Sequence, residues 1–227
     1  MFLSGSEIVL VRHGQGECNA AGVIGGDVGC RGLTPRGRRE SVCLADRLAE
    51  LDRQRRFDAL LTSPRPRVLE CAQIIGVRLG RRVTVVEPLR GQEFGTADGQ
   101  SWDHVIRGFG GPPTHDPDRP IAHGAEAWNA YATRVLAALS ELLAEHAGQR
   151  ILLVGHGKTT GLAGALLSGT ADPRSCAEGY VIDHGALSSW RRGPDGWRVL
   201  VHNDSSHLAH CDACPDDPHS TDAAMLT

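Results

Sequence analysis

Two short apolar runs, each leading into a histidine beside a glycine, most constrain how this chain can fold. Residues 8–14 read Ile-Val-Leu-Val-Arg-His-Gly, and residues 151–157 read Ile-Leu-Leu-Val-Gly-His-Gly. A short, continuous apolar run is typical of a strand buried on both faces, as in a parallel sheet. Open α/β sheets bind ligands at the carboxyl ends of such strands. The sequence therefore predicts an α/β fold with His13 and His156 at one binding edge.

Composition narrows the range of partners. The 227 residues carry a formal net charge of −3 and are 41% hydrophobic, as in an ordinary globular protein. No basic surplus points to a nucleic-acid partner, and no apolar run approaches the roughly 20 residues that span a membrane. The chain does not begin with a basic segment followed by an apolar one, so we expect no membrane association and a cytoplasmic protein.

The cysteines are seven in number and scattered. An odd, irregularly spaced set favours reduced thiols over a disulfide framework. Cys211 and Cys214 have the spacing of half a zinc site, with His207 and His210 nearby. No second pair of this kind exists, so we predict no metal site. No Walker-type or dinucleotide-binding glycine loop is present, and we expect no cofactor.

Hydrophobic periodicity predicts the remaining elements. Thr34 and Pro35 begin a helix that ends near Asp52. Further helices are expected at 68–79, 101–107, 125–145 and 159–167, and strands at 59–62, 82–87, 180–183, 186–191 and 197–202. Residues 109–122 contain four prolines and form either a lid over the site or an exposed connector. We expect one domain over residues 1–208 and a flexible tail over 209–227.

The chemistry follows from the side chains at the expected binding edge. Arg12 precedes His13, and the strand 59–62 ends in a Ser-Pro-Arg-Pro-Arg turn that supplies Arg65 or Arg67. Arginine forks match the oxygens of a phosphate dianion. A cationic pocket with an imidazole nucleophile indicates phosphoryl transfer through a phosphohistidine.

Seven short motifs in a fixed order support the same chemistry. They resemble those of the histidine phosphatase superfamily, in the branch similar to cofactor-dependent phosphoglycerate mutase. The motifs are Val11-Arg12-His13-Gly14 with Glu17 and Asn19; Leu33-Thr34 with Gly37; Ser63-Pro64 with Arg67; Phe94-Gly95 with Gly99; Gly124 with Glu126; Val154-Gly155-His156-Gly157; and Asn203-Asp204 with His207-Leu208.

This resemblance implies a three-layer α/β fold, with a mostly parallel central sheet flanked by helices. It also implies roles for individual residues. His13 would be the nucleophile, and the phosphate pocket would contain Arg12, Arg67 and His156, with Arg67 rather than Arg65 on the family position. The expected substrate contacts are Gly14, Asn19 and Gly157.

One position departs from the family pattern. The family has Leu-x-Glu ahead of Phe-Gly, and that glutamate protonates the leaving oxygen. Here residues 89–95 read Leu-Arg-Gly-Gln-Glu-Phe-Gly, so Gly91 stands where the acid is expected. Glu93 is the candidate replacement, with Glu126, Glu17 and Asp98 as alternatives. Each of these carboxylates is otherwise a surface charge or a charge at a helix start.

The resulting expectation is an enzyme, a phosphoric monoester hydrolase of the histidine acid phosphatase type. It would hydrolyse a small phosphorylated metabolite through a phosphohistidine on His13. One alternative is a phosphoglycerate mutase-like phosphoryl-transfer enzyme, against which the missing acid counts more heavily. Another is a repurposed or non-hydrolytic phosphate-binding member of the family. The sequence leaves a homodimer open and does not identify the substrate.

Overall fold

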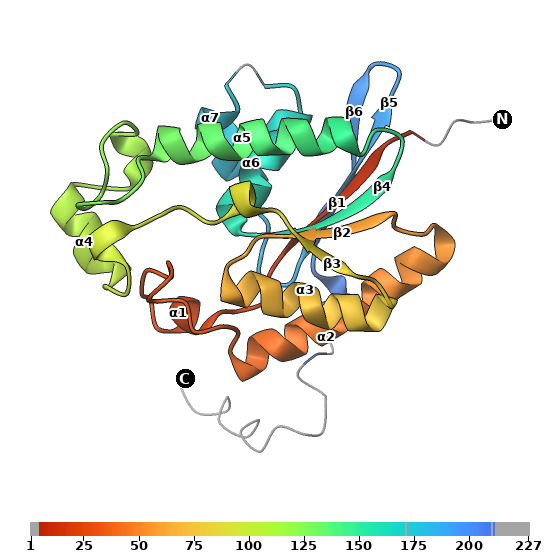
Figure 1. Cartoon of the computed structure of the whole chain (residues 1–227), viewed down its shortest axis with the longest axis horizontal. Coiled ribbons are helices and arrows are strands. Elements are labelled where there is room, and N and C mark those ends of the chain that lie inside the picture. Colours follow the sequence, from red (N-terminus) through yellow and green to blue (C-terminus); the bar gives the residue numbers. More distant parts are fainter. Residues whose placement is uncertain (1–4, 171, 210, 212–227) are drawn as a thin grey trace, which may run out of the picture.

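A six-stranded sheet forms the centre of the molecule (Figure 1). The computed structural model describes residues 5–170, 172–209 and 211. The strand order is β3-β2-β4-β1-β5-β6, in which β3, β2, β4 and β1 are parallel and β5 and β6 are antiparallel. The strands are β1 (Glu7–Arg12), β2 (Ala59–Thr62), β3 (Val83–Val85), β4 (Arg150–Gly155), β5 (Leu187–Gly193) and β6 (Gly196–Asp204). The predicted mostly parallel sheet is confirmed.

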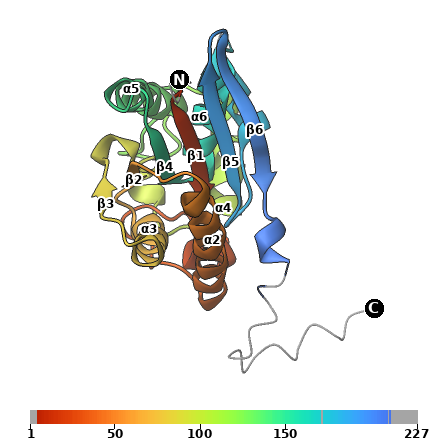
Figure 2. The same ribbon diagram turned by 90° about the vertical axis from the view of Figure 1, so that its right-hand side faces the viewer.

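Helices cover both faces of the sheet and complete the three layers. In Figures 1 and 2, α5 and α6 lie over one face, and α2 and α3 lie over the other. The helices are α1 (Glu17–Ala20), α2 (Pro35–Gln54), α3 (Pro66–Leu79), α4 (Trp102–Phe109), α5 (Trp128–Glu145), α6 (Gly157–Leu167) and α7 (Pro173–Cys176). None of the helices in these described ranges is long and apolar enough to cross a membrane.

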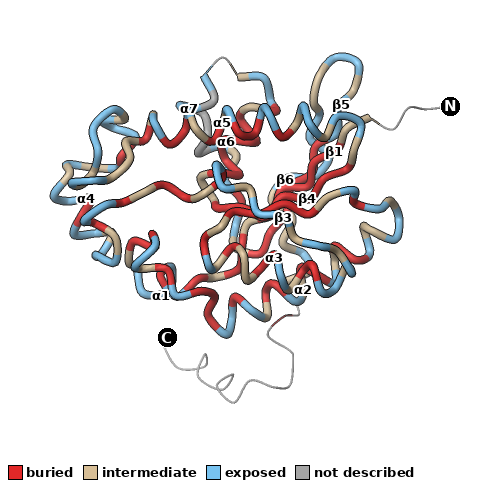
Figure 3. The backbone as a smooth tube through the Cα atoms, viewed as in Figure 1, coloured by how far each residue is buried: buried red, intermediate tan, exposed pale blue. Residues whose placement is uncertain are grey.

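The alternation of side chains along β1 divides the core into two clusters. Ile8 and Leu10 pack into the cluster with α5 and α6, whereas Val9 and Val11 pack into the cluster with α2 and α3. All four side chains are almost fully buried, and the central strands are red in Figure 3. Burying a side chain of this size stabilises a fold by about 1.5–3 kcal/mol. The two-sided burial explains why the apolar run is continuous rather than alternating.

Local signals set the helix ends that position the site. The hydroxyl of Thr34 accepts a hydrogen bond from the Gly37 amide at 2.9 Å, and Pro35 is the first residue of α2. Helix α3 likewise begins with a proline, at Pro66, and ends before Gly80, which has a φ of 61°. A positive φ of this kind favours glycine at a helix end. These caps hold the loops that lead from the strands into the helices.

A third, smaller cluster lies beyond the carboxyl ends of the parallel strands, around α4. Ile24, Phe94 and Val105 are buried there. Ile121 and Ala122 pack against the same cluster. The proline-rich segment 109–122 is therefore anchored at its end on this cluster, and it contains one 3₁₀ turn, Pro113–His115.

The strand expected at residues 180–183 is not present. A 3₁₀ turn, Ala177–Tyr180, precedes a segment without regular structure. The Ile182 carbonyl accepts from the Arg12 guanidinium at 2.9 Å, and the Asp183 amide donates to the Asn203 side chain at 2.8 Å. Side chains thus satisfy the backbone groups that a neighbouring strand would otherwise pair, so the prediction was wrong.

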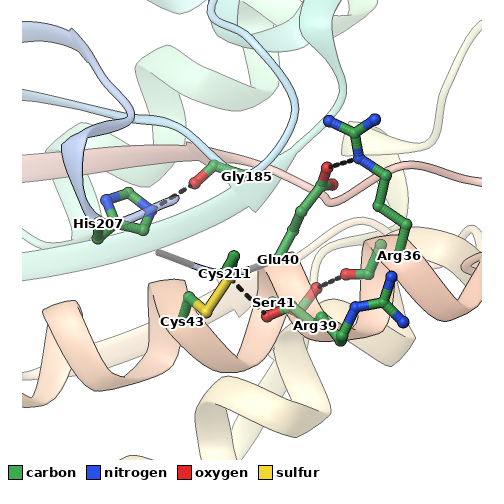
Figure 4. The surroundings of a disulfide bond; sticks show 9 residues. Arg36, Arg39, Glu40, Ser41, Cys43, Gly185, His207 and Cys211 are labelled. Carbon is green, nitrogen blue, oxygen red and sulfur yellow. Dashed lines mark hydrogen bonds and ion pairs between the residues drawn. A yellow bond between two sulfur atoms is a disulfide. The ribbon is translucent and has the colours of Figure 1, made fainter. Parts of the chain in front are cut away.

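The expectation of reduced thiols is wrong for two cysteines. Cys43, on α2, forms a disulfide with Cys211, and their Cα atoms are 6.3 Å apart (Figure 4). Cys211 is only 5% exposed, so the chain is still fixed to the body of the protein at this residue, beyond the expected start of the tail. Disulfides persist in oxidising surroundings, and this one does not support the cytoplasmic expectation. Residues 212–227 lie outside the described residues.

The same bond bears on the half zinc site considered for the C-terminal segment. The sulfur of Cys211 is held in the disulfide, and the His207 ring lies 2.8 Å from the Gly185 carbonyl oxygen (Figure 4). His210 and Cys214 lie outside the part of the chain that the structure describes. A disulfide sulfur is not the thiolate that zinc binds, so Cys211 in this state is not a metal ligand.

Candidate active site

The two predicted histidines meet at the carboxyl ends of neighbouring strands. His13 directly follows β1, and His156 directly follows β4, where it caps α6. The strands pair in parallel, so their last residues lie side by side. The ring centroids of His13 and His156 are 5.6 Å apart, and the residues are 2% and 5% exposed.

Arg67 joins the two rings and fixes where their protons lie. From the first turn of α3, its Nε donates to His13 Nε2 at 3.1 Å, and its Nη2 lies 3.2 Å from His156 Nδ1. A guanidinium can only donate, so both of these ring nitrogens are acceptors. The proton of His13 is then on Nδ1, 2.6 Å from the Gly14 carbonyl oxygen, and that of His156 is on Nε2, 2.9 Å from the Ser63 hydroxyl.

The surroundings keep both imidazoles neutral. Burial lowers the pKa of His13 well below its ordinary value of 6.5, and the positive charge of Arg67 lowers it further. The same two causes, in the same order, lower the pKa of His156. At neutral pH the Nε2 atom of His13 therefore carries a lone pair, as a nucleophile must.

Arg12 is positioned by a residue that the sequence analysis missed. Its Nη1 donates to the Ile182 carbonyl at 2.9 Å, and its Nη2 donates to His184 Nε2 at 2.9 Å. Burial, followed by the charges of Arg12 and Arg67, lowers the pKa of His184 to about 4. Neutral His184 can accept from Arg12. The available signal was the His-Gly pair at 184–185, a further copy of the pattern that marks both central histidines.

A cavity of about 240 Å³ opens over these side chains. Its walls combine cationic, aromatic and small residues, with Lys158 and Gly157 at the start of α6. The N-terminal end of a helix attracts anions, and it adds to the charges of the arginines. The lining residues are Arg12, His13, Cys18, Asn19, Val23, Gly25, Arg67, Phe94, Trp102, Tyr131, His156, Gly157, Lys158 and Val181.

Two of the three expected substrate contacts, Asn19 and Gly157, line this cavity. At Gly157 an added Cβ would lie 3.2 Å from the Arg12 guanidinium carbon, so glycine allows the arginine to approach the helix start. Gly14 is not in the lining. A Cβ there would collide with the Gly37 backbone of α2, so this glycine allows the loop to pack against the helix.

Arg65 and Glu93 form an ion pair outside the cavity lining. Arg65 is 1% exposed, and its Nη2 is 2.9 Å from Glu93 Oε2; its Nη1 also pairs with Asp27. Of the two competing arginines, Arg67 contacts the histidines. The side chain of Glu93 is 41% exposed. Its role as the general acid stays a prediction.

The sequence analysis also passed over the residues that form the cavity walls. Phe94 was noted as part of a family motif, and Tyr131 lies in a helix that was predicted without a role in the site. Neither Lys158 nor Trp102 was assigned to the site. All four line the cavity. A lysine directly after the His-Gly pair at a helix start was the signal that could have found Lys158.

Comparisons with known proteins agree with this geometry. The family model described as the histidine phosphatase superfamily, branch 1, matches residues 8–205. The phosphoglycerate mutase-like protein 4 of Arabidopsis thaliana is 26% identical over 208 residues, which cover 89% of this chain and 87% of that protein. A metal-independent phosphoserine phosphatase of the same plant is 29% identical over 157 residues, which cover 67% of this chain and 64% of that protein.

Solved structures share the fold. The α-ribazole phosphatase from Shigella flexneri superimposes with a TM-score of 0.72 at 24% identity, over 88% of this chain and 96% of that one. A phosphoserine phosphatase from Entamoeba histolytica, solved with 3-phosphoglyceric acid, gives 0.71 at 21% identity, over 89% and 99% of the two chains. The family model matches most of this chain, and both histidines lie at the sheet edge. This chain therefore belongs to the histidine phosphatase superfamily, branch 1.

Proposed function

We propose that this protein is a phosphatase that hydrolyses a small phosphorylated metabolite through a phosphohistidine on His13. One observation carries the proposal. His13 Nε2 is unprotonated and held in orientation by the bond between Nδ1 and the Gly14 carbonyl, and it faces a cationic cavity. The names of relatives support the phosphatase class, since they include phosphoserine and α-ribazole phosphatases.

The first step forms the phosphoenzyme. His13 Nε2 attacks phosphorus, a nitrogen–phosphorus bond forms, and the bond to the leaving oxygen breaks with its electron pair on that oxygen. The Nε atom of Arg67, which donates to His13 Nε2 in this structure, donates to a phosphate oxygen instead. Arg12, Arg67 and His156 stabilise the charge on the oxygens that do not react.

Hydrolysis completes the cycle. Water attacks the phosphorus of the phosphohistidine, the nitrogen–phosphorus bond breaks, and its electron pair returns to Nε2. The proton that water loses passes to this ring nitrogen and then to solvent as inorganic phosphate leaves. In the mutase alternative, a substrate hydroxyl would take the place of this water and no phosphate would be released.

His13→Ala tests the nucleophile directly. We expect phosphate release from p-nitrophenyl phosphate to fall by several orders of magnitude, because positioning and charge stabilisation alone leave only residual catalysis. Brief incubation of the wild type with a ³²P-labelled phosphate ester should give an acid-labile, base-stable labelled protein. That label should be missing from the variant.

The matched control is His104→Ala, since His104 is an exposed histidine on α4. This variant should keep wild-type activity and labelling. Full activity in His13→Ala would refute the phosphohistidine mechanism. Interconversion of phosphoglycerates without release of phosphate would replace the phosphatase with the mutase.

A further inference from the structure

The cavity walls lack the kind of group that usually protonates a leaving oxygen. Among the described residues that line it, none carries a carboxylate. General acid catalysis contributes roughly 10²–10⁴-fold when a basic leaving group must be protonated. The phosphohistidine scheme places the electron pair of the broken bond on the leaving oxygen. That oxygen therefore needs a different partner in this protein.

Three of the four carboxylates considered as the acid are engaged elsewhere, and the fourth, Glu17, is exposed and does not line the cavity. Glu93 pairs with Arg65 at 2.9 Å, and Glu126 pairs with Arg134 at 2.7 Å. Asp98 accepts hydrogen bonds of 2.7–3.0 Å from three backbone amides of the loop at 26–29. These contacts give each of the three carboxylates a structural role outside the cavity lining.

Lys158 lines this cavity and carries an ammonium group. Lys158 is two residues beyond His156 in the first turn of α6, and its Nζ donates to Gln92 Oε1 at 2.8 Å. The amide nitrogen of Gln92 is in turn bonded to the Glu126 carbonyl at 2.8 Å. The neighbour of Gln92 is Gly91, where an added Cβ would lie 3.1 Å from His156 Nε2. Lys158 is thus held by the residue that follows Gly91 in the chain, and Gly91 is the position from which a longer side chain would reach His156.

Aromatic rings surround this cation. The Nζ atom lies 5.4–5.8 Å from the ring centroids of Phe94, Trp102 and Trp128. Aromatic faces attract cations at such distances, so the rings help to hold the charge in place. Phe94 and Trp102 also line the cavity, where they offer flat apolar surfaces to a flat leaving group.

We infer that Lys158 stabilises the leaving group, and that the substrates are phosphates whose leaving group departs as a stable anion. Aryl, enol, acyl and phosphoryl leaving groups belong to this class. As His13 Nε2 bonds to phosphorus, the phosphorus–oxygen bond on the opposite side breaks. The leaving oxygen takes the electron pair and accepts a hydrogen bond from the ammonium without taking its proton. An alkoxide needs a full proton, which an alkylammonium, a much weaker acid than a carboxylic acid, supplies poorly. This inference rests on the proposed function.

The dependence of rate on the leaving group provides the test. A series of aryl phosphates is compared in which the pKa of the released phenol rises, together with glycerol phosphate as an alkyl ester. The wild type should hydrolyse the aryl esters far faster than glycerol phosphate. In Lys158→Met, kcat should fall by about 10²-fold for the most basic phenol, as when one charge-stabilising donor is lost. It should fall least for p-nitrophenol.

Two further variants separate charge from structure. Lys158→Arg keeps the cation and should retain the shallow dependence on the leaving group. Arg107→Met removes an exposed cation from α4 and should leave every rate unchanged. The slope of log kcat against the pKa of the released phenol is measured on one enzyme sample. Partial unfolding of a variant lowers all rates equally and therefore leaves this slope unchanged.

The outcomes are distinct. A uniform loss over the whole aryl series in Lys158→Met would overturn the inference, as would a wild type that hydrolyses glycerol phosphate as fast as aryl phosphates. A loss confined to the alkyl ester in Glu93→Gln would also overturn it in favour of a carboxylic acid. A wild type inactive on every ester refutes the proposed function and with it this inference, whereas an active one with an unchanged slope in Lys158→Met refutes the inference alone.

Discussion

Two buried imidazoles, His13 and His156, and one half-buried imidazole, His184, make the stability of the protein depend on pH. Burial is the largest cause that lowers the pKa of His13, His156 and His184. The pKa of His184 falls to about 4. In the unfolded chain each ring takes up its proton near the ordinary value of 6.5. The folded state therefore binds fewer protons below that pH. The stability contributed by these neutral rings is complete above pH 6.5 and is lost as the pH falls below that value, down to about pH 4 in the case of His184.

We expect Tm to drop between pH 7 and pH 5, and to drop less in His184→Gln, which keeps an acceptor for Arg12 but cannot be protonated. Thermal unfolding followed by circular dichroism at both pH values measures this. His104→Gln, which changes an exposed histidine, should show the wild-type drop. Equal drops in His184→Gln and the wild type would contradict the assignment of His184 as a neutral acceptor.

At the scale of residues, the sequence was informative where a side chain follows directly from a strand end. His13 and His156 were placed this way, and Arg67 from the family position. Lys158 could not be placed, because the direction of a long side chain depends on the Gln92 contact from a distant loop. His184 was hidden by the expected strand that precedes it.

Among the elements, β1 is joined to both neighbouring strands by one carboxylate. Glu7 is 3% exposed and accepts from Arg150 of β4 at 2.7 Å and from Arg191 of β5 at 2.9 Å. Arg55 also pairs with it, at 3.1 Å. Burial alone would raise the pKa of Glu7, but the hydrogen bonds and charges of Arg150 and Arg191 outweigh it and lower the pKa.

Glu7→Gln should therefore lower the free energy of unfolding in urea by about 3 kcal/mol, since it leaves buried Arg150 without its counter-charge. The matched control is Glu50→Gln, which breaks an ion pair with Arg47 in which the Glu50 side chain is 54% exposed. Such surface pairs contribute at most about 1 kcal/mol. A loss in Glu7→Gln no larger than in the control would show that this network is marginal.

The elements were predictable wherever burial imposes a period. Apolar spacing predicts the strands at 8–11 and 151–154 and the helices α2, α3 and α5. The segment 180–183 has the composition of a strand, but its partners are the side chains of Arg12 and Asn203. Contacts between residues far apart in sequence decide such a case, and spacing does not reveal them.

On the scale of the whole molecule, the disulfide links positions separated by 168 residues. Loop closure of this length restricts the unfolded chain, so reduction should lower the free energy of unfolding by about 2–5 kcal/mol. Urea titrations with and without reductant measure the loss. A Cys43→Ser variant should have the same free energy of unfolding with and without reductant. An equal effect of reductant on the variant and on the wild type would contradict the pairing. No pattern in the sequence could select this pair, because the fold alone brings the two cysteines together.

The same bond changes what a broken backbone means for this protein. A protease that cuts once within residues 109–122, most of which are exposed, leaves His13 and Cys43 on one fragment and His156 and Cys211 on the other. The disulfide keeps both fragments in one covalent molecule. The oxidised product gains the mass of one water and loses no residue, and the two halves of the site separate only when reductant is added.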